Sequence, residues 1–377
     1  MLINLWYVVE WSDTVKDKPV KSKVLGQDIV LFRDEAGKVH CLNNVCIHRG
    51  GSLAGGWCTN GNVTCPYHGW QFAPSGQCVK VPSEGDDFRI SERFQIDAYP
   101  TVERYGMIWA FMGDLPEKER PEIPIFAEYD DPSLRRLKCE NTWQADAARV
   151  VENGIDLAHA SFVHPSFGNP ETAADNHLEF MEVNEWEGRA TNVQYPPATT
   201  GVQKGARKEK QETRTHPRWA LNGMLVHIRI DINPTWTTTM YDANTPIDAN
   251  TTRTFAWQTR TFLKSRIFDR NSLKRLKKIF EQDMEIVEKA APHYLPDHLV
   301  NETSVGDDKF MSSFRAARRK YIEKGFKIDS QAIEQSKSET VFAIPSPNRR
   351  EAEAKGIRWV FEKVPLIPAK KVRATTK

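Results

Sequence analysis

Two short segments constrain this chain more than any other feature, because each carries one cysteine and one histidine at close spacing. The first contains Cys46 and His48; after sixteen further residues, the second contains Cys65 and His68. Clustered cysteine and histidine side chains are typical of metal sites. The two segments together therefore predict a site with two thiolate and two imidazole ligands.

The order of the ligands indicates which kind of metal group they hold. Structural zinc sites commonly place cysteines together and histidines together. Here each segment supplies one of each, which favours a [2Fe–2S] cluster with both cysteines on one iron and both histidines on the other. Gly50, Gly51 and Gly69 follow the ligands, where a missing Cβ lets backbone N–H groups turn toward sulfide. A structural zinc loop is the alternative.

A second group of possible ligands follows about ninety residues later and comprises Glu152, Asp156, His159 and His164. Asp156 and His159 are three residues apart and would share one face of a helix. His159 and His164 are five apart, which on a continuous helix separates them by about 140°. They can bind one ion only if the helix breaks between them, and Pro165 provides a reason, because the residue before a proline is disfavoured in the α region.

A third ligand for the same ion is predicted on a later helix, over residues 272–290. At about 100° per residue, Asp283 lies within the apolar stripe of this helix, among Leu276, Ile279, Phe280, Ile286, Val287 and Ala290. A buried carboxylate is costly unless it is paired, hydrogen-bonded or metal-bound. Two histidines and one carboxylate are the ligand set of non-haem Fe(II) oxygenases and leave open positions on the metal. A salt bridge is the alternative.

The pattern along the 377 residues predicts an α+β protein with two domains. The clearest strand patterns of the second domain cover 225–231 and 252–260, and Asn141 and Thr142 are candidate caps of its first helix. The turn-rich and basic stretch around 196–212 is interpreted as a loop and as a candidate lid. The predicted segments are 1–115, short strands; 116–135, a proline-rich linker; 136–330, the second domain; and 331–377, an extension of unknown role.

Composition and charge exclude some function classes and indicate a location. Lys and Arg number 52 against 50 Asp and Glu, so the net charge of +2 does not indicate a nucleic-acid partner. No apolar run approaches the roughly 18 residues that a membrane span needs. The N-terminus lacks signal-peptide features. Four of the six cysteines lie outside the motif and are expected to be reduced thiols, which predicts a cytoplasmic protein.

The motifs Cys46-x-His48-Arg-Gly and Cys65-Pro-Tyr-His68-Gly-Trp resemble those of Rieske non-haem iron oxygenases, catalytic (alpha) subunit. The segment Glu-Asn-Gly-Ile-Asp-Leu-Ala-His at 152–159 resembles the corresponding sequence in the alpha-only monooxygenase and O-demethylase branch of this family. The resemblance implies an all-β Rieske domain followed by a helix-grip-like catalytic domain with an antiparallel sheet and helices. It also implies a [2Fe–2S] cluster on Cys46, His48, Cys65 and His68. The mononuclear Fe(II) would be held by His159, His164 and Asp283.

The resemblance further implies an activity. Electrons from NAD(P)H would arrive through a reductase or ferredoxin, and O2 would be used to hydroxylate or oxidatively demethylate a small aromatic or cyclic substrate. It implies a head-to-tail homotrimer in which Asp156 is the catalytic bridge, hydrogen-bonded to His68 across the interface and to His159 within the chain. Either Glu152 or Asn153 would match a nearby polar residue of the family. The alternatives are a ring cis-dihydroxylating dioxygenase and an electron carrier without mononuclear iron.

Overall fold

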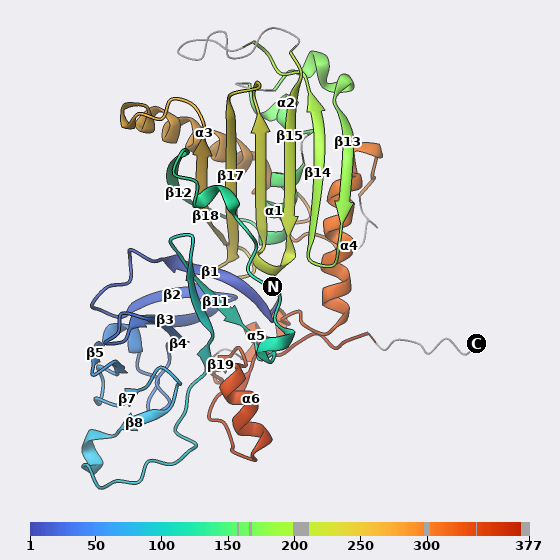
Figure 1. Cartoon of the computed structure of the whole chain (residues 1–377). Coiled ribbons are helices and arrows are strands. Elements are labelled where there is room, and N and C mark those ends of the chain that lie inside the picture. Colours follow the sequence, from blue (N-terminus) through green and yellow to red (C-terminus); the bar gives the residue numbers. More distant parts are fainter. Residues whose placement is uncertain (157, 166–167, 199–210, 298–301, 337, 371–377) are drawn as a thin grey trace. The chain divides into compact units, whose positions relative to one another are not determined.

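The structure, a computed structural model, describes all residues except 157, 166–167, 199–210, 298–301, 337 and 371–377. The chain divides into two compact units, which are shown in Figure 1 and described separately. The first unit comprises Met1–Glu122, Pro246–Ala249 and Tyr321–Lys377, and the second comprises Ile123–Thr245 and Asn250–Lys320. The stretch predicted as a C-terminal extension, 331–377, therefore belongs with the N-terminal segment.

Short strands build the first unit. They form two four-stranded sheets, one three-stranded sheet and a parallel pair. The sheets are β1 (Leu5–Trp11), β11 (Met107–Met112) and β10 (Thr101–Arg104); β2 (Val20–Val24), β3 (Gln27–Arg33), β4 (Val39–Asn43) and β9 (Ala98–Tyr99); β5 (Trp57–Thr59), β6 (Asn62–Thr64), β7 (Gln71–Phe72) and β8 (Cys78–Lys80); and the pair β19 (Phe342–Ala343) and β20 (Glu362–Lys363). Helices α5 (Ser330–Ser336) and α6 (Pro347–Ala354) lie in the C-terminal part of this unit.

Apolar sequence explains which strands lie inside. Every residue of β1 and β11 is buried, and these two strands pair antiparallel along almost their whole length. A separate apolar cluster lies beneath the two cysteine–histidine segments and contains Leu53, Phe72 and Trp70 together with Cys46 and Cys65. Close packing against this buried cluster therefore holds the two cysteine–histidine segments in position.

A buried carboxylate ties the C-terminal segment to the strands of the first unit. Asp97 is fully buried; it accepts hydrogen bonds from the Ser346 hydroxyl at 2.7 Å and from Trp359 Nε1 at 3.1 Å. The guanidinium of Arg349, also buried, lies 3.7 Å from the same carboxylate. These contacts give the segment a structural role that the sequence had not indicated.

We expect Asp97→Ala to lower the free energy of unfolding by about 3–5 kcal/mol, because it removes the acceptor of Ser346 and Trp359 and leaves the buried Arg349 with Glu353 as its remaining carboxylate partner. Chemical denaturation measures this change. The double variant Asp97→Ala/Arg349→Leu removes both charges and should recover part of the loss. A single variant as stable as the wild type would show that the carboxylate does not hold the segment.

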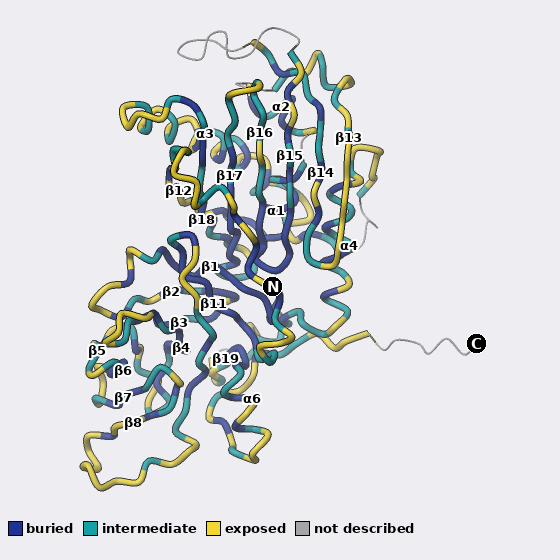
Figure 2. Tube along the Cα trace, in the orientation of Figure 1, coloured by how far each residue is buried: buried dark blue, intermediate teal, exposed yellow. Residues whose placement is uncertain are grey.

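One antiparallel sheet of seven strands forms the centre of the second unit (Figure 1). The strands, in spatial order, are β12 (Arg135–Trp143), β18 (Thr252–Arg260), β17 (Thr237–Pro246), β16 (Leu225–Asp231), β15 (Thr213–Ala220), β14 (Glu187–Gln194) and β13 (His177–Val183). The two clearest strand predictions, 225–231 and 252–260, are confirmed with these bounds. Figure 2 shows that the central strands are largely buried, whereas the edge strand β13 is exposed.

The helices of the second unit are α1 (Ala147–Ile155), α2 (Ala160–Val163), α3 (Asp269–Val287) and α4 (Lys309–Glu323), of which α4 belongs to this unit as far as Lys320. Helix α1 packs against β15 and β16, and α3 packs against β12 and against α1. Gly154 permits this contact, because a Cβ on it would lie 2.9 Å from Val226 of β16. The predicted α+β class, with an antiparallel sheet and helices, is confirmed.

The predicted start of the first helix is wrong. Asn141 and Thr142 do not cap it; both belong to β12, where they pair with Thr254 and Arg253 of β18. The N-cap is Asp146, whose side chain accepts a hydrogen bond from the backbone of Ala148 at 3.3 Å. Strand pairing across more than a hundred residues prevails over the local capping preference.

Candidate metal centres

The two cysteine–histidine segments of the first unit are built alike. Cys46 donates its backbone N–H to Gly51 and accepts one from Gly50, while Cys65 donates to Trp70 and accepts from Gly69. Gly50 and Gly69 both have φ of 72°, a left-handed conformation that glycine adopts without strain. The second segment connects the paired strands β6 and β7, and a bridge between Val45 and Ser52 closes the first. The sequence therefore folds into two matching loop tips.

The side chains of these loops converge. The rings of His48 and His68 are 4.5 Å apart between centroids, and His48 also stacks on Trp70 at 4.7 Å. Burial, together with His68 and Arg49, lowers the pKa of His48 and so favours the neutral imidazole that binds a metal. Nδ1 of His48 is buried without a hydrogen-bond partner among the described residues. A buried nitrogen of this kind is satisfied if it binds a metal.

The thiols fit the same group. Cys46 and Cys65 are each 1% exposed, and burial raises the pKa of Cys46 to about 12, with the neighbouring Cys65 adding to the shift. A Cβ at Gly51 would lie 2.9 Å from Cys65 Sγ, so this position keeps the sulfur accessible. All six cysteines are free thiols. Two thiols and two imidazoles arranged in this way fit a [2Fe–2S] cluster, in which metal binding deprotonates the thiols.

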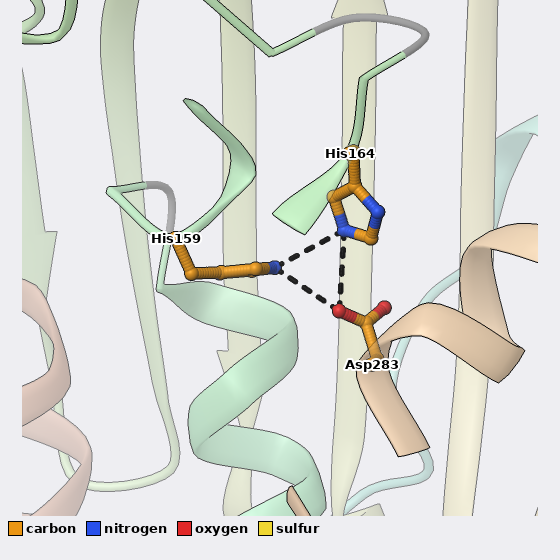
Figure 3. Close-up of side chains that lie close together, drawn as sticks. All are labelled: His159, His164 and Asp283. Carbon is orange, nitrogen blue, oxygen red and sulfur yellow. Dashed lines mark hydrogen bonds and ion pairs between the residues drawn. The ribbon is translucent and has the colours of Figure 1, made fainter. Parts of the chain in front are cut away.

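A second convergence of possible ligands lies in the second unit (Figure 3). Nε2 of His159 is 3.3 Å from Nε2 of His164, and Oδ1 of Asp283 lies 3.3 Å from the first nitrogen and 3.2 Å from the second. Two ligand atoms about 2.1 Å from one ion and at right angles to each other are about 3.0 Å apart. The three atoms therefore surround a point from which each could reach a single ion.

The local backbone explains how two histidines five residues apart can meet. Helix α1 ends at Ile155, and the short helix α2 separates His159 at its N-cap from His164 at its C-cap. His164 leaves the helical conformation, with φ of −113° and ψ of 87°, immediately before Pro165. The expected break is therefore present, and it turns both imidazoles toward the same side (Figure 3).

The third member, Asp283, points inward as the apolar stripe of α3 predicts, and the residue is 8% exposed. Leu276, Phe280 and Val287 are buried with it, whereas Ile286, also placed in the stripe, is 55% exposed. Although burial opposes ionisation, the two imidazoles lower the pKa of Asp283. Burial would lower the pKa of His159, but the carboxylates of Asp156 and Asp283 raise it to about 9.

The donor set fits Fe(II). Two imidazoles and one carboxylate are suited to this metal, and ligand atoms at right angles leave further positions open for small molecules. Nδ1 of His159 and Oδ1 of Asp283 are both buried without a hydrogen-bond partner among the described residues. That these three residues bind iron stays a prediction, which the geometry permits.

Sequence reasoning did not single out Gln282, which contacts one of the imidazoles. Its Oε1 lies 3.0 Å from Nδ1 of His164, so it can accept a hydrogen bond from Nδ1–H and leave Nε2 free for a metal. The signal was its place beside Asp283 on α3. Because a glutamine is common on helix surfaces, the sequence could not distinguish this contact from solvent exposure.

We expect Gln282→Leu to weaken iron binding at the three-residue site by about 10–100-fold, because His164 loses the group that fixes its tautomer. Titration of Fe(II) into metal-free protein, with the first site loaded separately, measures the affinity. Gln282→Glu retains an acceptor and should restore most of it, and the exposed neighbour Glu281→Ala is the matched control. Unchanged affinity in the leucine variant would show that this contact is dispensable.

The predicted bridging residue lies next to these ligands but at a longer distance than expected. Asp156 caps the end of α1, and its Oδ2 is 3.7 Å from Nδ1 of His159, beyond hydrogen-bond distance. Of the two neighbours considered, Asn153 lines the adjacent cavity. Glu152 instead forms an ion pair with Arg315 of α4 and is buried there, so its role is structural.

A cavity of about 720 Å³ opens beside the three ligands. Its wall on the sheet side consists of alternate residues of the central strands, among them Ile228, Ile230, Thr238, Met240 and Gln258. Trp236 also lines it. Most of the proposed lid at 196–212 lies outside the described residues. The confirmed strands β16 and β18 thus contribute to one wall of the cavity.

The remaining histidines have partners of other kinds. His40 lies 2.7 Å from Asp34, His216 lies 3.1 Å from Asp231, and His227 lies 3.5 Å from Glu128. His293 packs against the ring of Tyr294. His298 lies outside the described residues. Among the described parts of the chain, His159, His164 and Asp283 are the group of three whose atoms approach closely enough to hold one ion.

Two domain families match this sequence. Residues 5–100 match the Rieske [2Fe-2S] domain, and residues 143–324 match the vanillate O-demethylase oxygenase C-terminal domain. Together the matches cover about three quarters of the chain, and each contains one of the two groups of ligands. The border between the matches lies near the change from the first unit to the second.

Curated relatives are oxygenase components. The chain is 37% identical over 160 residues to the tert-butanol monooxygenase / tert-amyl alcohol desaturase oxygenase subunit of Aquincola tertiaricarbonis, covering 42% of this chain and 34% of the relative. It is 34% identical over 176 residues to the dicamba O-demethylase oxygenase component of Stenotrophomonas maltophilia, covering 47% and 51%. The alignments thus span about half or less of the length of these relatives.

Solved structures share the fold. An NdmA variant of Pseudomonas putida CBB5 with caffeine has a TM-score of 0.71 at 22% identity, covering 85% of this chain and 91% of that chain. Dicamba monooxygenase bound to dicamba has a TM-score of 0.69 at 22% identity, covering 84% and 97%. In the described part of this chain, helices that are both long and apolar enough to cross a membrane are absent.

Proposed function

We propose, on the premise that this chain belongs to the Rieske non-haem iron oxygenases, that it is an oxygenase component which hydroxylates or oxidatively demethylates a small organic molecule. The observation that carries the proposal is the meeting of His159, His164 and Asp283 beside a cavity of about 720 Å³. An electron carrier needs the first group of ligands only. A second, buried ligand set beside a cavity large enough for a small molecule supports an enzyme.

The two groups of ligand residues in this chain have separate roles. Cys46, His48, Cys65 and His68 would hold the [2Fe–2S] cluster, and His159, His164 and Asp283 would hold Fe(II). When bound, these groups supply one-electron transfer and O2 activation. The protein orients the ligands, Gln282 holds a proton on Nδ1 of His164, and the apolar wall of Ile228, Ile230 and Met240 keeps water away from a bound substrate.

Partners and location follow from the same proposal. An external reductase or ferredoxin reduces the cluster with electrons from NAD(P)H. We further propose a head-to-tail homotrimer in which Asp156, 26% exposed at its side chain, reaches His68 of the next copy. Six free cysteines support a reducing, cytoplasmic location.

Oxygen uptake tests the proposed activity. The reconstituted protein, supplied with a surrogate ferredoxin reductase and NADH, is screened against small aromatic and cyclic compounds, including aryl methyl ethers. We expect substrate-dependent O2 consumption for some of them, with one labelled oxygen atom from 18O2 retained in a hydroxylated product. Two retained atoms would instead identify a dihydroxylating dioxygenase. A protein that binds iron at the first group alone and consumes no O2 with any compound would be an electron carrier.

A further inference from the structure

One acidic side chain stands apart from the other groups that line the cavity. Asp242 lies on β17, on the same face as Met240 and Thr238, and opposite Val226 of β16. It is 6% exposed, and its surroundings in the wall are largely apolar. Neither the cluster nor the three-residue site uses this carboxyl group in the proposed function.

The side chain of Asp242 is buried, and one of its oxygens lacks a partner in the described part of the chain. Its Oδ1 has no hydrogen bond among the described residues, and the hydrogen bond from Asn244 reaches its backbone oxygen instead. Burial raises the pKa of Asp242 to about 8, and the charge of nearby Asp283 adds to this. A carboxyl group left in this state is costly, so a structure that retains one in a cavity wall indicates a ligand that satisfies it.

Arg260, which also lines the cavity, is paired with a different carboxylate. Arg260 is 2% exposed, and its guanidinium donates to Asp269 at 2.8 Å and to the backbone of Phe262 and Leu263, while its Nη1 has no hydrogen-bond partner among the described residues. The ion pair with Asp269, at the start of α3, neutralises the charge of Arg260. Asp242 has no such ion pair to the described residues, so an anionic group placed next to it would be repelled.

We propose that Asp242 is the specificity-determining residue of the cavity, and that it accepts a hydrogen bond from a hydroxyl or N–H group on an otherwise apolar substrate. The inference rests on the proposed function and deepens it by naming the class of substrate. A carboxyl oxygen accepts such a hydrogen bond whether or not the group is ionised. Strands β16 and β17 hold the residue rigidly, which suits a group that orients a ligand.

The chemistry predicts which molecules the cavity rejects. A ligand of the same shape without a donor buries the carboxyl group and leaves it unsatisfied, so it should bind more weakly by about tenfold or more. A carboxylate ligand places a second acid near Asp242 and should also bind weakly. A neutral alcohol, phenol or amine with apolar rings or branches satisfies both the carboxyl group and the apolar wall.

Equilibrium dialysis of the iron-loaded, oxidised protein, without reductase, tests the proposal by binding alone. Three probes of one shape are compared: 2-naphthol, which has a donor; 2-methoxynaphthalene, which has only an acceptor; and 2-naphthoate, an anion. We expect the wild type to bind the naphthol about tenfold or more tightly than the other two. In Asp242→Leu this preference should fall to within about threefold, mainly through weaker binding of the naphthol.

Two further variants guard against indirect effects. Asp242→Asn keeps the size and an acceptor oxygen and should retain most of the preference. Thr239→Val removes a hydroxyl from the opposite face of β17, outside the cavity lining, and it should retain the full preference. If Asp242→Leu lost its folded structure, Asp242→Ala, which also removes the acceptor, would test the same loss of preference.

The iron content of each sample separates the two levels of the proposal. A full iron complement with equal binding of all three probes, or with no binding of the naphthol, overturns the role of Asp242 and leaves the oxygenase proposal standing. A wild type that holds no iron at the three-residue site overturns the oxygenase proposal itself. A preference that survives in Asp242→Leu assigns recognition to another residue and contradicts the inference.

Discussion

Asp283→Ala is expected to remove the iron of the second unit, to leave the [2Fe–2S] cluster in place, and to lower substrate oxidation by more than about a thousandfold. The physical reason is the loss of one of the three proposed ligands, and of the one carboxylate among the described residues whose oxygen lies within 3.3 Å of both imidazoles. Iron per chain should fall by one, while the visible absorption of the cluster is unchanged. Metal analysis and the absorption spectrum measure the two outcomes separately.

The control for this variant lies on the same helix. Glu285 is two residues from Asp283 on α3 but is exposed and contacts Lys289. Glu285→Ala should keep the full iron content and activity, which shows that α3 tolerates the loss of an acid on its outer face. An Asp283→Ala protein that retains all of its iron would refute the ligand assignment.

Asp156→Ala is expected to have the second largest effect. We expect it to retain both metal groups but to lose about 100-fold in product formed per electron supplied, because in the proposed trimer this carboxylate would orient His159 and link it to the cluster of the next copy. Oδ2 of Asp156 lies 3.7 Å from Nδ1 of His159 in this structure, so the proposed role requires this contact to shorten. The ratio of product to NADH consumed measures this coupling.

Two comparisons make the Asp156 result specific. Asp156→Asn retains the shape without the charge and should recover part of the coupling, whereas Asp131→Ala, at an exposed position, should behave as the wild type. Normal coupling in Asp156→Ala would remove Asp156 from the electron path. Loss of iron in that variant would instead make it a supporting residue of the three-residue site.

The sequence predicted the parts of the fold that local patterns encode. The two loops were recognisable from spacing alone, and β16 and β18 from alternating apolar residues. The inward direction of Asp283 followed from helical geometry, because an acid within the apolar stripe lies on the face of the helix that packs against the core.

Features that depend on distant partners were missed. Helix α3 begins at Asp269, three residues before the predicted start, and its first carboxylate pairs with Arg135 and Arg260 on two strands. The role of the C-terminal segment depends on Asp97, some 250 residues earlier. Neither contact leaves a local pattern, since each member alone reads as an ordinary charged residue.

Asp242 shows the same limit at the cavity. In the sequence it is one acid shortly after three consecutive threonines, and only the pairing of β17 with β16 shows that it lines the cavity. Gln282 likewise acquires a role only when α3 meets the segment that carries His164. Ligand types can be recognised from short motifs, whereas the groups that orient ligands and substrates come from tertiary contacts.

The central claim is that one polypeptide builds two separate iron centres. Iron and acid-labile sulfide per chain, measured on protein reconstituted anaerobically and freed of loosely bound metal, test it most directly. The account predicts about three iron atoms and two sulfides. Two iron atoms and two sulfides in a protein of unaltered fold would contradict it, because His159, His164 and Asp283 would then hold no ion.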